Sequence, residues 1–108
     1  MGKGFLSLAA ATILNAVANG YSFGFDIVDI TGMPSGTVYP ALRRLEEAGY
    51  LSSTWEGAQV AQADQRPRRK YYETTRSGRQ VLAEAVKRYR LLDQAKLATL
   101  REPKASRA

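Results

Sequence analysis

The sequence predicts a mainly α-helical domain with a small β-hairpin, and three observations support this fold class. Apolar residues recur at helical spacing on either side of residues 50–75. Within that region, two short β-prone stretches flank a polar stretch that contains glycine and proline. Of the 108 residues, 44% are hydrophobic and 24% are charged, which is typical of a folded chain with a single modest core.

The first predicted helix, between Phe5 and Ala18, is almost continuously apolar. A helix that is hydrophobic nearly all round must be covered on more than one side, which in so small a domain indicates a partner subunit. The uncharged run from residue 4 to 25 superficially resembles a signal peptide. However, Asn15 and Asn19 interrupt it, and its apolar part is too short to span a bilayer. We therefore expect a buried or dimer-buried helix.

A helix-turn-helix is predicted in the following segment. A short second helix starts near Ser22 and is broken by residues 31–34. Its apolar positions are Phe23, Ile27 and Ile30. A third helix runs from about Ser35 to Ala48, and Gly49 stands where a C-cap is expected. Two helices joined by a tight turn that contains glycine form a helix-turn-helix.

The third helix is amphipathic but starts unusually. Its core-facing positions are Val38, Leu42 and Leu45, and its opposite face carries Gly36, Tyr39, Pro40 and Arg43. Glycine lowers helix stability, and proline lacks the N–H that a helix interior needs. Gly36 and Pro40 are therefore poor choices for stability alone, but they suit a first turn whose backbone must approach another molecule closely.

Two β-prone segments, residues 50–55 and 70–75, are predicted to pair as a hairpin. The segment 56–69 between them is rich in glutamine, alanine and charge, so we expect a long, mobile tip. A hairpin directly after a helix-turn-helix forms a wing, which makes residues 1–75 a winged helix-turn-helix domain. Trp55, the single tryptophan, is expected to pack beneath this wing.

A long final helix is predicted over residues 76–100, with Thr75 as its N-cap. Its apolar stripe includes Leu82, Ala85, Val86, Tyr89 and Leu92. A lone projecting helix would expose this stripe to water, whereas pairing with a second copy would cover it. The alternative is that the stripe packs only within its own subunit. We assign dimerisation to the stripe together with Phe5 and Leu8, and we expect residues 101–108 to form a frayed tail.

Positive charge is concentrated in particular elements. The 16 Lys and Arg residues exceed the 10 Asp and Glu residues, for a net charge of +6, which favours nucleic acid as a partner over a membrane surface. Arg43 and Arg44 lie on the third helix, and six basic residues fall between Arg66 and Arg79. A DNA-binding winged helix needs this distribution, because its helix reads the major groove while its wing follows the backbone or minor groove.

The chain contains no cysteine and no histidine. Their absence excludes thiolate metal sites, cysteine nucleophiles and the usual general base. Asp26 and Asp29 lie three residues apart, but such a pair is typical of a solvated helix surface. We therefore expect no enzymatic activity, no metal site and no cofactor.

Several segments resemble the PadR family of transcriptional regulators. Residues 34–51, PSGTVYPALRRLEEAGYL, are similar to the family's recognition-helix signature. The segment PRRKYY at 67–72 is similar to its wing motif, and TTRSGR at 74–79 to the start of its last helix. Residues 24–27 resemble its glycine-aromatic-acidic-aliphatic segment in the second helix.

This resemblance implies a homodimeric winged-helix repressor of the short form, with one C-terminal dimerisation helix, that binds a palindromic operator in double-stranded DNA. It also implies a cytoplasmic protein, bound to the nucleoid when on DNA. Such proteins are commonly released from DNA by a small phenolic or hydrophobic molecule. The chain departs from the family at Phe23, where histidine is usual, and at Phe25, where tyrosine is usual. The alternative function is a winged-helix protein-interaction module that does not bind DNA.

The residues assigned to DNA contact are Ser35, Gly36, Thr37, Tyr39, Pro40, Arg43, Arg44, Arg68, Arg69, Lys70 and Tyr72. Ser35 is expected to cap the third helix and to leave its first N–H groups free for a phosphate. Thr37 and Tyr39 offer hydroxyl groups to phosphate oxygens, and Thr37 or Pro40 can touch a thymine methyl group.

Arginines on the third helix and in the wing are expected to differ in role. Arg43 is the candidate for a guanine edge, and Arg44 reaches a phosphate or a nearby glutamate. The basic residues of the wing contact the backbone or minor groove. Tyr71 and Tyr72 point to opposite faces of their strand, so one lies in the core and the other faces DNA or solvent. The alternation does not decide between them, and Tyr72 is included among the contacts.

Overall fold

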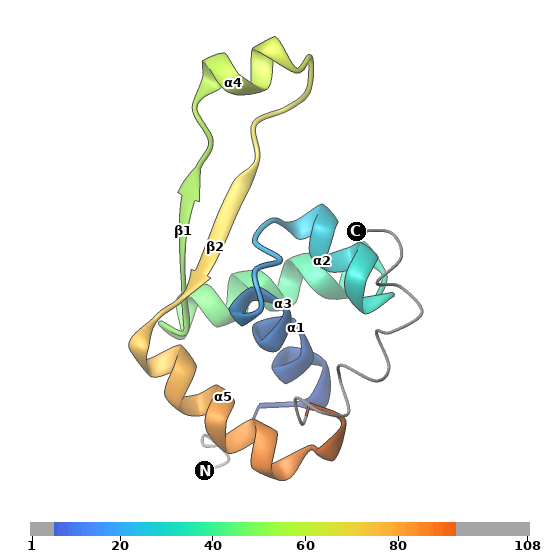
Figure 1. Cartoon of the computed structure of the whole chain (residues 1–108), viewed down its shortest axis with the longest axis vertical. Coiled ribbons are helices and arrows are strands. Elements are labelled where there is room, and N and C mark those ends of the chain that lie inside the picture. Colours follow the sequence, from blue (N-terminus) through green and yellow to red (C-terminus); the bar gives the residue numbers. More distant parts are fainter. Residues whose placement is uncertain (1–5, 93–108) are drawn as a thin grey trace.

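The computed structural model of the chain describes residues 6–92. It is mainly helical with one two-stranded antiparallel hairpin, as predicted (Figure 1). In chain order, the elements are α1 (Leu8–Ala18), α2 (Gly24–Thr31), α3 (Ser35–Glu47), β1 (Leu51–Trp55), α4 (Ala58–Ala63), β2 (Lys70–Thr74), α5 (Arg76–Arg88) and the 3₁₀ helix η2 (Arg90–Leu92). No helix in this part of the chain is long and apolar enough to cross a lipid bilayer.

Helix α1 is packed on several sides. It begins at Ser7, whose Oγ accepts a 3.1 Å hydrogen bond from the N–H of Ala10. Helices α2, α3 and α5 and strand β2 all contact it, and Ile13 and Leu14 are fully buried. The chain itself therefore covers most of this helix, which was predicted to be buried or dimer-buried, although Leu8 remains 40% exposed.

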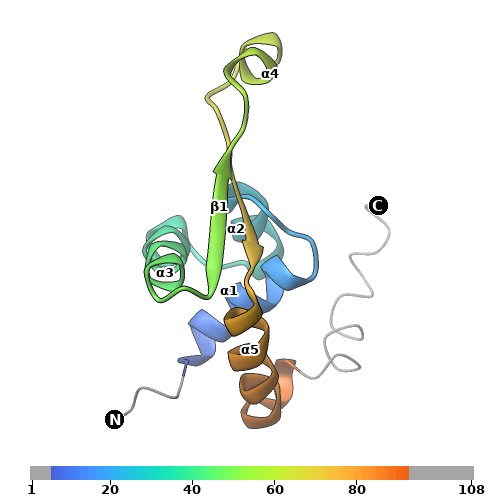
Figure 2. The same ribbon diagram turned by 90° about the vertical axis from the view of Figure 1, so that its left-hand side faces the viewer.

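Helices α2 and α3 form the helix-turn-helix, with α3 beside β1 (Figure 2). Helix α2 ends at Gly32, whose φ of +73° is a left-handed conformation that favours glycine. Gly49 has a φ of +85° after α3, and the N–H of Tyr50 bonds the carbonyl of Leu45 at 2.9 Å, as in a Schellman motif. The predicted core-facing residues Val38, Leu42 and Leu45 are at most 3% exposed, which confirms that face of the helix.

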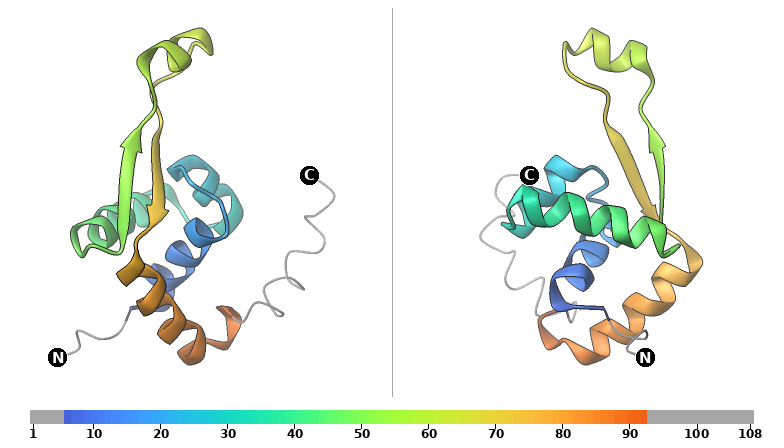
Figure 3. Two further views of the ribbon diagram at one scale, coloured as in Figure 1. Left: turned by 60° about the vertical axis from the view of Figure 1, so that its left-hand side comes forward. Right: turned by 180° about the vertical axis from the view of Figure 1, so that it is seen from behind.

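The hairpin projects away from the helices as an extended wing (Figures 1 and 3). Its strands pair antiparallel, from Leu51 opposite Thr74 at the base to Trp55 opposite Lys70 at the outer end. The base of the wing is buried against the helical core, where Leu51 is 2% exposed, whereas Trp55 at the outer end is 55% exposed.

The tip of the wing contains a helix rather than the mobile loop predicted for residues 56–69. Helix α4 has the sequence AQVAQA, in which alanine and glutamine are good helix formers. Ala61 is 2% exposed, so the tip buries one side of this short helix. Gln65 follows with a φ of +56°, which turns the chain back toward β2.

Helix α5 begins as predicted, since the Oγ1 of Thr75 accepts a 3.0 Å hydrogen bond from the N–H of Gly78. It ends at Arg88, short of the predicted continuous helix over residues 76–100. Tyr89 takes an extended conformation with φ −111° and ψ 106°, and η2 follows it. The remainder of the predicted helix and the predicted tail at 101–108 lie outside the described residues.

The apolar stripe of α5, for which a second copy was predicted as cover, packs against its own chain. Leu82, Ala85 and Leu92 are at most 8% exposed, and Val86 and Tyr89 are partly buried against them and the core. The Tyr89 hydroxyl donates a 2.6 Å hydrogen bond to the carbonyl of Leu6, just before α1. A role of the stripe in dimerisation stays a prediction, and Phe5 lies outside the described residues.

Candidate nucleic-acid interface

The outer face of α3 is exposed and carries most of the predicted contact residues. Tyr39 is 45% exposed, and Gly36 and Arg43 lie on the same face in the turns before and after it. Pro40 is half-buried, and Ser35, Thr37 and Arg44 are exposed. A Cβ atom at Gly36 would meet no atom within 4 Å, so no contact inside the chain requires glycine there. The missing side chain leaves room for another molecule to approach the backbone.

The start of α3 is uncapped by any side chain. Pro34, not Ser35, is the N-cap, so the prediction that Ser35 caps the helix is wrong. The N–H groups of Thr37 and Val38 bond the carbonyl of Pro34 at 2.9 and 3.1 Å. The N–H groups of Ser35 and Gly36 precede these first helical bonds. Exposed N–H groups at the positive end of a helix dipole favour an anion such as a phosphate.

Tyr39 is positioned by Gly24, the first residue of α2. A Cβ atom at Gly24 would lie 2.2 Å from Cε1 and 2.7 Å from the hydroxyl oxygen of Tyr39. The tyrosine ring therefore occupies the space that any larger residue at position 24 would fill. Gly24 belongs to the segment 24–27 that resembles a segment of the PadR family. The sequence did not reveal its contact with Tyr39, because the two residues belong to different helices.

Glu46, near the end of α3, joins the helix to both strands of the wing. The Ser53 hydroxyl donates a hydrogen bond to Oε2 of Glu46, and the Lys70 ammonium lies 3.3 Å from its Oε1. The Ser53 hydrogen bond, followed by Lys70, holds the pKa of Glu46 below its ordinary value. Lys70 was predicted to contact DNA. In the structure it pairs with Glu46, and this pairing sets the wing against α3.

The neck of the wing, formed by Glu56 and residues 66–69 beyond the ends of the two strands, is organised around the carboxylate of Glu56. The side chain of Glu56 is 7% exposed. It accepts hydrogen bonds from the Arg66 guanidinium at 2.6 and 2.8 Å, from the Tyr71 hydroxyl at 3.2 Å and from the N–H of Arg69 at 3.2 Å. These donors, Arg66 foremost, lower the pKa of Glu56 to about 2 and outweigh the opposing effect of desolvation. The charge of Arg66 is therefore largely compensated inside the wing.

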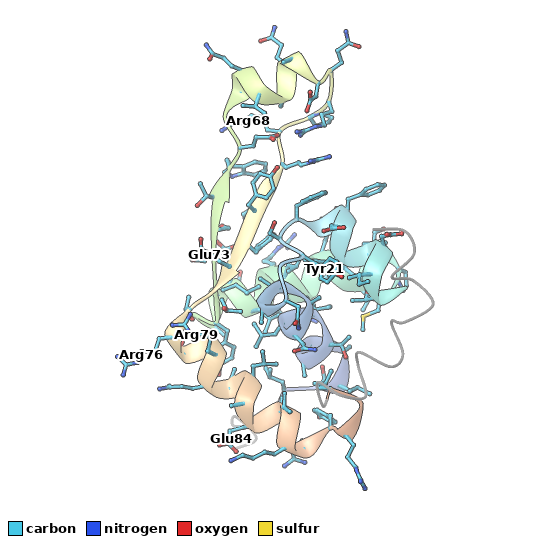
Figure 4. The ribbon with its side chains drawn as sticks, in the orientation of Figure 1. Tyr21, Arg68, Glu73, Arg76, Arg79 and Glu84 are labelled. Atoms are coloured by element: carbon cyan, nitrogen blue, oxygen red, sulfur yellow. The ribbon has the colours of Figure 1, made fainter. Side chains whose placement is uncertain are left out.

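Trp55 lies on the surface of the wing, so the prediction that it packs beneath the wing is wrong. Its side chain has two cationic neighbours: the Cζ of Arg68 lies 5.7 Å and the Nζ of Lys70 5.8 Å from the ring. The Nε of Arg68 also donates a 2.8 Å hydrogen bond to the backbone carbonyl of Glu56. Arg68 is exposed at the outer part of the wing, while Arg76 and Arg79 lie at its base (Figure 4).

The two tyrosines of β2 have different surroundings. Tyr72 is 8% exposed within the core, so its assignment to DNA contact is wrong, and burial raises the pKa of its hydroxyl. Tyr71 is half-buried and meets Phe23 edge to face, with ring centroids 5.7 Å apart. The Cζ of Arg69 lies 4.2 Å from the Phe23 ring centroid. Phe23, which stands where the family usually has histidine, therefore packs against two residues of the wing.

The profile of the transcriptional regulator PadR-like family matches residues 13–84, from within α1 to within α5. The chain belongs to this family. The match includes the whole helix-turn-helix and the wing. Among curated proteins, no sequence is significantly similar to the chain.

Solved structures of similar fold include proteins from several bacteria. Smu.1704 from Streptococcus mutans is 31% identical, with a TM-score of 0.65 over 86% of this chain and 86% of that one. BpsR from Bordetella bronchiseptica, whose DNA binding is regulated by 6-hydroxynicotinic acid, is 22% identical, with a TM-score of 0.66 over 89% and 68%. PadR from Bacillus subtilis, solved in complex with operator DNA, is 22% identical, with a TM-score of 0.60 over 74% and 48%.

Proposed function

We propose that this PadR-family protein regulates transcription by binding operator DNA sequence-specifically. Helix α3 enters the major groove, and the wing follows the adjacent backbone or minor groove. The observation that carries this proposal is the outer face of α3, where Gly36, Tyr39 and Arg43 are exposed beyond an uncapped helix N-terminus. The operator complex of the Bacillus subtilis PadR, which shares this fold, supports the same assignment.

Within this interface, the site residues fall into three proposed roles. Ser35 and Gly36 present backbone N–H groups to a phosphate, while Tyr39 offers a hydroxyl group. Arg43 donates to a guanine edge, which gives sequence discrimination. Arg68 contacts the backbone from the wing. Each phosphate contact by a cation releases condensed counterions, so affinity falls as salt rises.

We further propose that the protein is a homodimeric repressor that binds a palindromic operator. In such a dimer, two α3 helices enter the major groove about 34 Å apart, one helical turn of DNA. Among the described residues of the predicted interface, Leu8, at the start of α1, is the exposed large apolar one and is open to a second copy. Sedimentation in solution, a footprint with two half-sites, and reduced transcription from a reporter that carries the operator test these three points. A phenolic or hydrophobic effector stays a prediction.

The experiment that tests the function is selection of bound sequences from random duplex DNA, followed by binding measurements with variants. Arg43→Ala should weaken binding to the selected duplex by about 5- to 150-fold, which corresponds to about 1–3 kcal/mol. Its binding to a random duplex should change much less. Arg90→Ala is the matched control, because Arg90 is exposed in η2, at the far end of the molecule from the wing (Figure 1).

Two outcomes contradict the proposal at different levels. Equal losses on selected and random duplexes would exclude base reading by Arg43 while leaving DNA binding intact. If the wild-type protein enriches no sequence and binds no duplex, the DNA-binding function is wrong, and the protein-interaction module becomes the better explanation.

A further inference from the structure

The wing exposes a large aromatic side chain. Trp55 is the single tryptophan of the chain and is 55% exposed at the outer end of β1. Tryptophan is usually highly buried, and a large exposed aromatic residue beside polar groups often marks a contact surface. The cations of Arg68 and Lys70 each lie within 6 Å of its ring, at 5.7 and 5.8 Å.

Trp55 lies on the hairpin face that meets α3. Side chains alternate along a strand, so Ser53 and Trp55 point to the same face of β1. Ser53 bonds Glu46 of α3, and Glu46 follows Arg43 by three residues, on the same side of the helix. Lys70 connects the two regions, because it pairs with Glu46 and also lies over the Trp55 ring. The surface of Trp55 is therefore continuous with the outer face of α3.

The neck of the wing holds this surface in place. Glu56, the residue after Trp55, accepts four hydrogen bonds from its neighbours, and its backbone carbonyl accepts the Nε of Arg68. Its N–H also bonds the carbonyl of Arg69 at 2.7 Å, which extends the pairing of the strands beyond Trp55. A contact group that is already ordered loses less conformational freedom when it binds.

We propose that Trp55 is a DNA-contact residue that packs its ring against the deoxyribose wall of the minor groove, next to the major-groove segment that α3 reads. Deoxyribose presents an apolar face beside a phosphate, and Trp55 presents an apolar ring beside the guanidinium of Arg68. This complementarity selects DNA over an acidic protein surface, which lacks the regular alternation of sugar and phosphate. The inference rests on the proposed DNA-binding function and adds a contact made by shape rather than by base edges.

The single tryptophan allows a direct test on the full-length protein. When the wild-type protein binds a duplex selected from random sequences, the emission of Trp55 should shift to the blue and its quenching by acrylamide should fall. Trp55→Ala should weaken binding by about 5- to 30-fold, or about 1–2 kcal/mol, on selected and random duplexes alike. It should not change the dependence of affinity on salt, whereas Arg68→Ala should lower that slope by about one.

Controls separate this inference from a general weakening of the wing and from failure of the proposed function. Val60→Ala removes another exposed apolar side chain, 54% exposed on α4, and should retain affinity. A loss equal to that of Trp55→Ala would overturn the specific role of Trp55. Unchanged emission and quenching in a complex that anisotropy shows to be bound would also overturn it, while leaving the DNA-binding function in place. If no duplex binds the wild-type protein, the proposed function itself has failed.

Thermal unfolding checks that Trp55→Ala is folded. Because the ring is largely exposed, its melting temperature should stay close to that of the wild-type protein. Trp55→Phe keeps an aromatic ring and should recover part of the lost affinity, whereas no recovery with a folded variant would contradict packing by the ring.

Discussion

Replacing Gly36 by alanine should stabilise the protein and weaken its binding to DNA. Gly36 is the second residue of α3, it is exposed, and a Cβ atom there would meet nothing within 4 Å. Alanine loses less backbone entropy than glycine when a helix forms. In the proposed complex, however, its methyl group stands where the first turn of α3 approaches a phosphate.

The two effects have different sizes. The gain in free energy of unfolding should be about 0.5–1 kcal/mol, which for a domain of this length raises the melting temperature by about 2–8 °C. Holding the backbone away from the phosphate removes about one charge-assisted hydrogen bond. That loss costs about 1.5–3 kcal/mol of binding free energy, or about 10- to 150-fold in Kd.

Both effects are measured on one preparation, by thermal unfolding and by fluorescence anisotropy with a labelled duplex. A lower melting temperature would show that glycine is required by the fold at this position. An unchanged Kd together with a higher melting temperature would show that the first turn of α3 does not approach DNA closely. Either result refutes the reasoning.

The matched control is Gly78→Ala in α5, where the fold does require glycine. A Cβ atom at Gly78 would lie 2.0 Å from the carbonyl oxygen of Tyr50, far inside van der Waals contact. The hydroxyl groups of Thr75 and Ser77 donate to the carbonyl of Gly49 at 2.6 and 2.9 Å and hold α5 at this close approach. The variant should lose about 1–3 kcal/mol of stability, the opposite sign to the substitution in α3.

Two further predictions concern the groups that position the interface. Gly24→Ala should displace the ring of Tyr39 and weaken DNA binding by about 5- to 30-fold with little change in melting temperature. In the Tyr39→Ala background, the same substitution should weaken binding no further. An additive loss would show that the two residues act independently. The carboxyl group of Glu56 has its pKa lowered from 4.5 to about 2, so its contribution to stability is complete above about pH 4.5 and is lost as the pH falls toward 2. The free energy of unfolding should therefore decrease more over this range in the wild-type protein than in Glu56→Gln, and parallel pH curves would contradict the assignment.

Much of the fold could be predicted because the signals for it are local. Thr75 caps α5 through a bond to an N–H three residues away, and Gly49 ends α3 through its own positive φ. The spacing of Val38, Leu42 and Leu45 determines which side of α3 is apolar, and the structure buries that side. The outer face of α3 followed from the same geometry, because residues opposite a buried stripe must face away from the core.

The roles of the wing residues could not be predicted in the same way, because partners distant in the sequence decide them. Strand alternation separates Tyr71 from Tyr72 but does not say which face of the hairpin meets the core. Lys70 and Arg66 belong to the same basic cluster in the sequence, which gives no reason to assign them different partners. In the structure, Lys70 pairs with Glu46 of α3 and Arg66 pairs with Glu56 of the neck. Such pairings depend on how the wing is set against the helices.

The end of α5 shows the same difference between what the sequence predicts and what the tertiary structure adds. The apolar stripe through Leu82, Ala85 and Leu92 follows from helical spacing in the sequence, which predicted a second copy as its cover and left packing within its own subunit as the alternative. Only the tertiary structure shows how the chain itself covers the stripe, because the break at Tyr89 and the hydrogen bond from its hydroxyl to the carbonyl of Leu6 turn the chain back toward α1. The sequence alone thus determined, through periodicity and capping, which surfaces are apolar and which are basic. It also determined that the backbone of the third helix is open at Gly36. The tertiary structure determined which of those surfaces remain exposed to a partner, because burial depends on contacts between residues far apart in the chain.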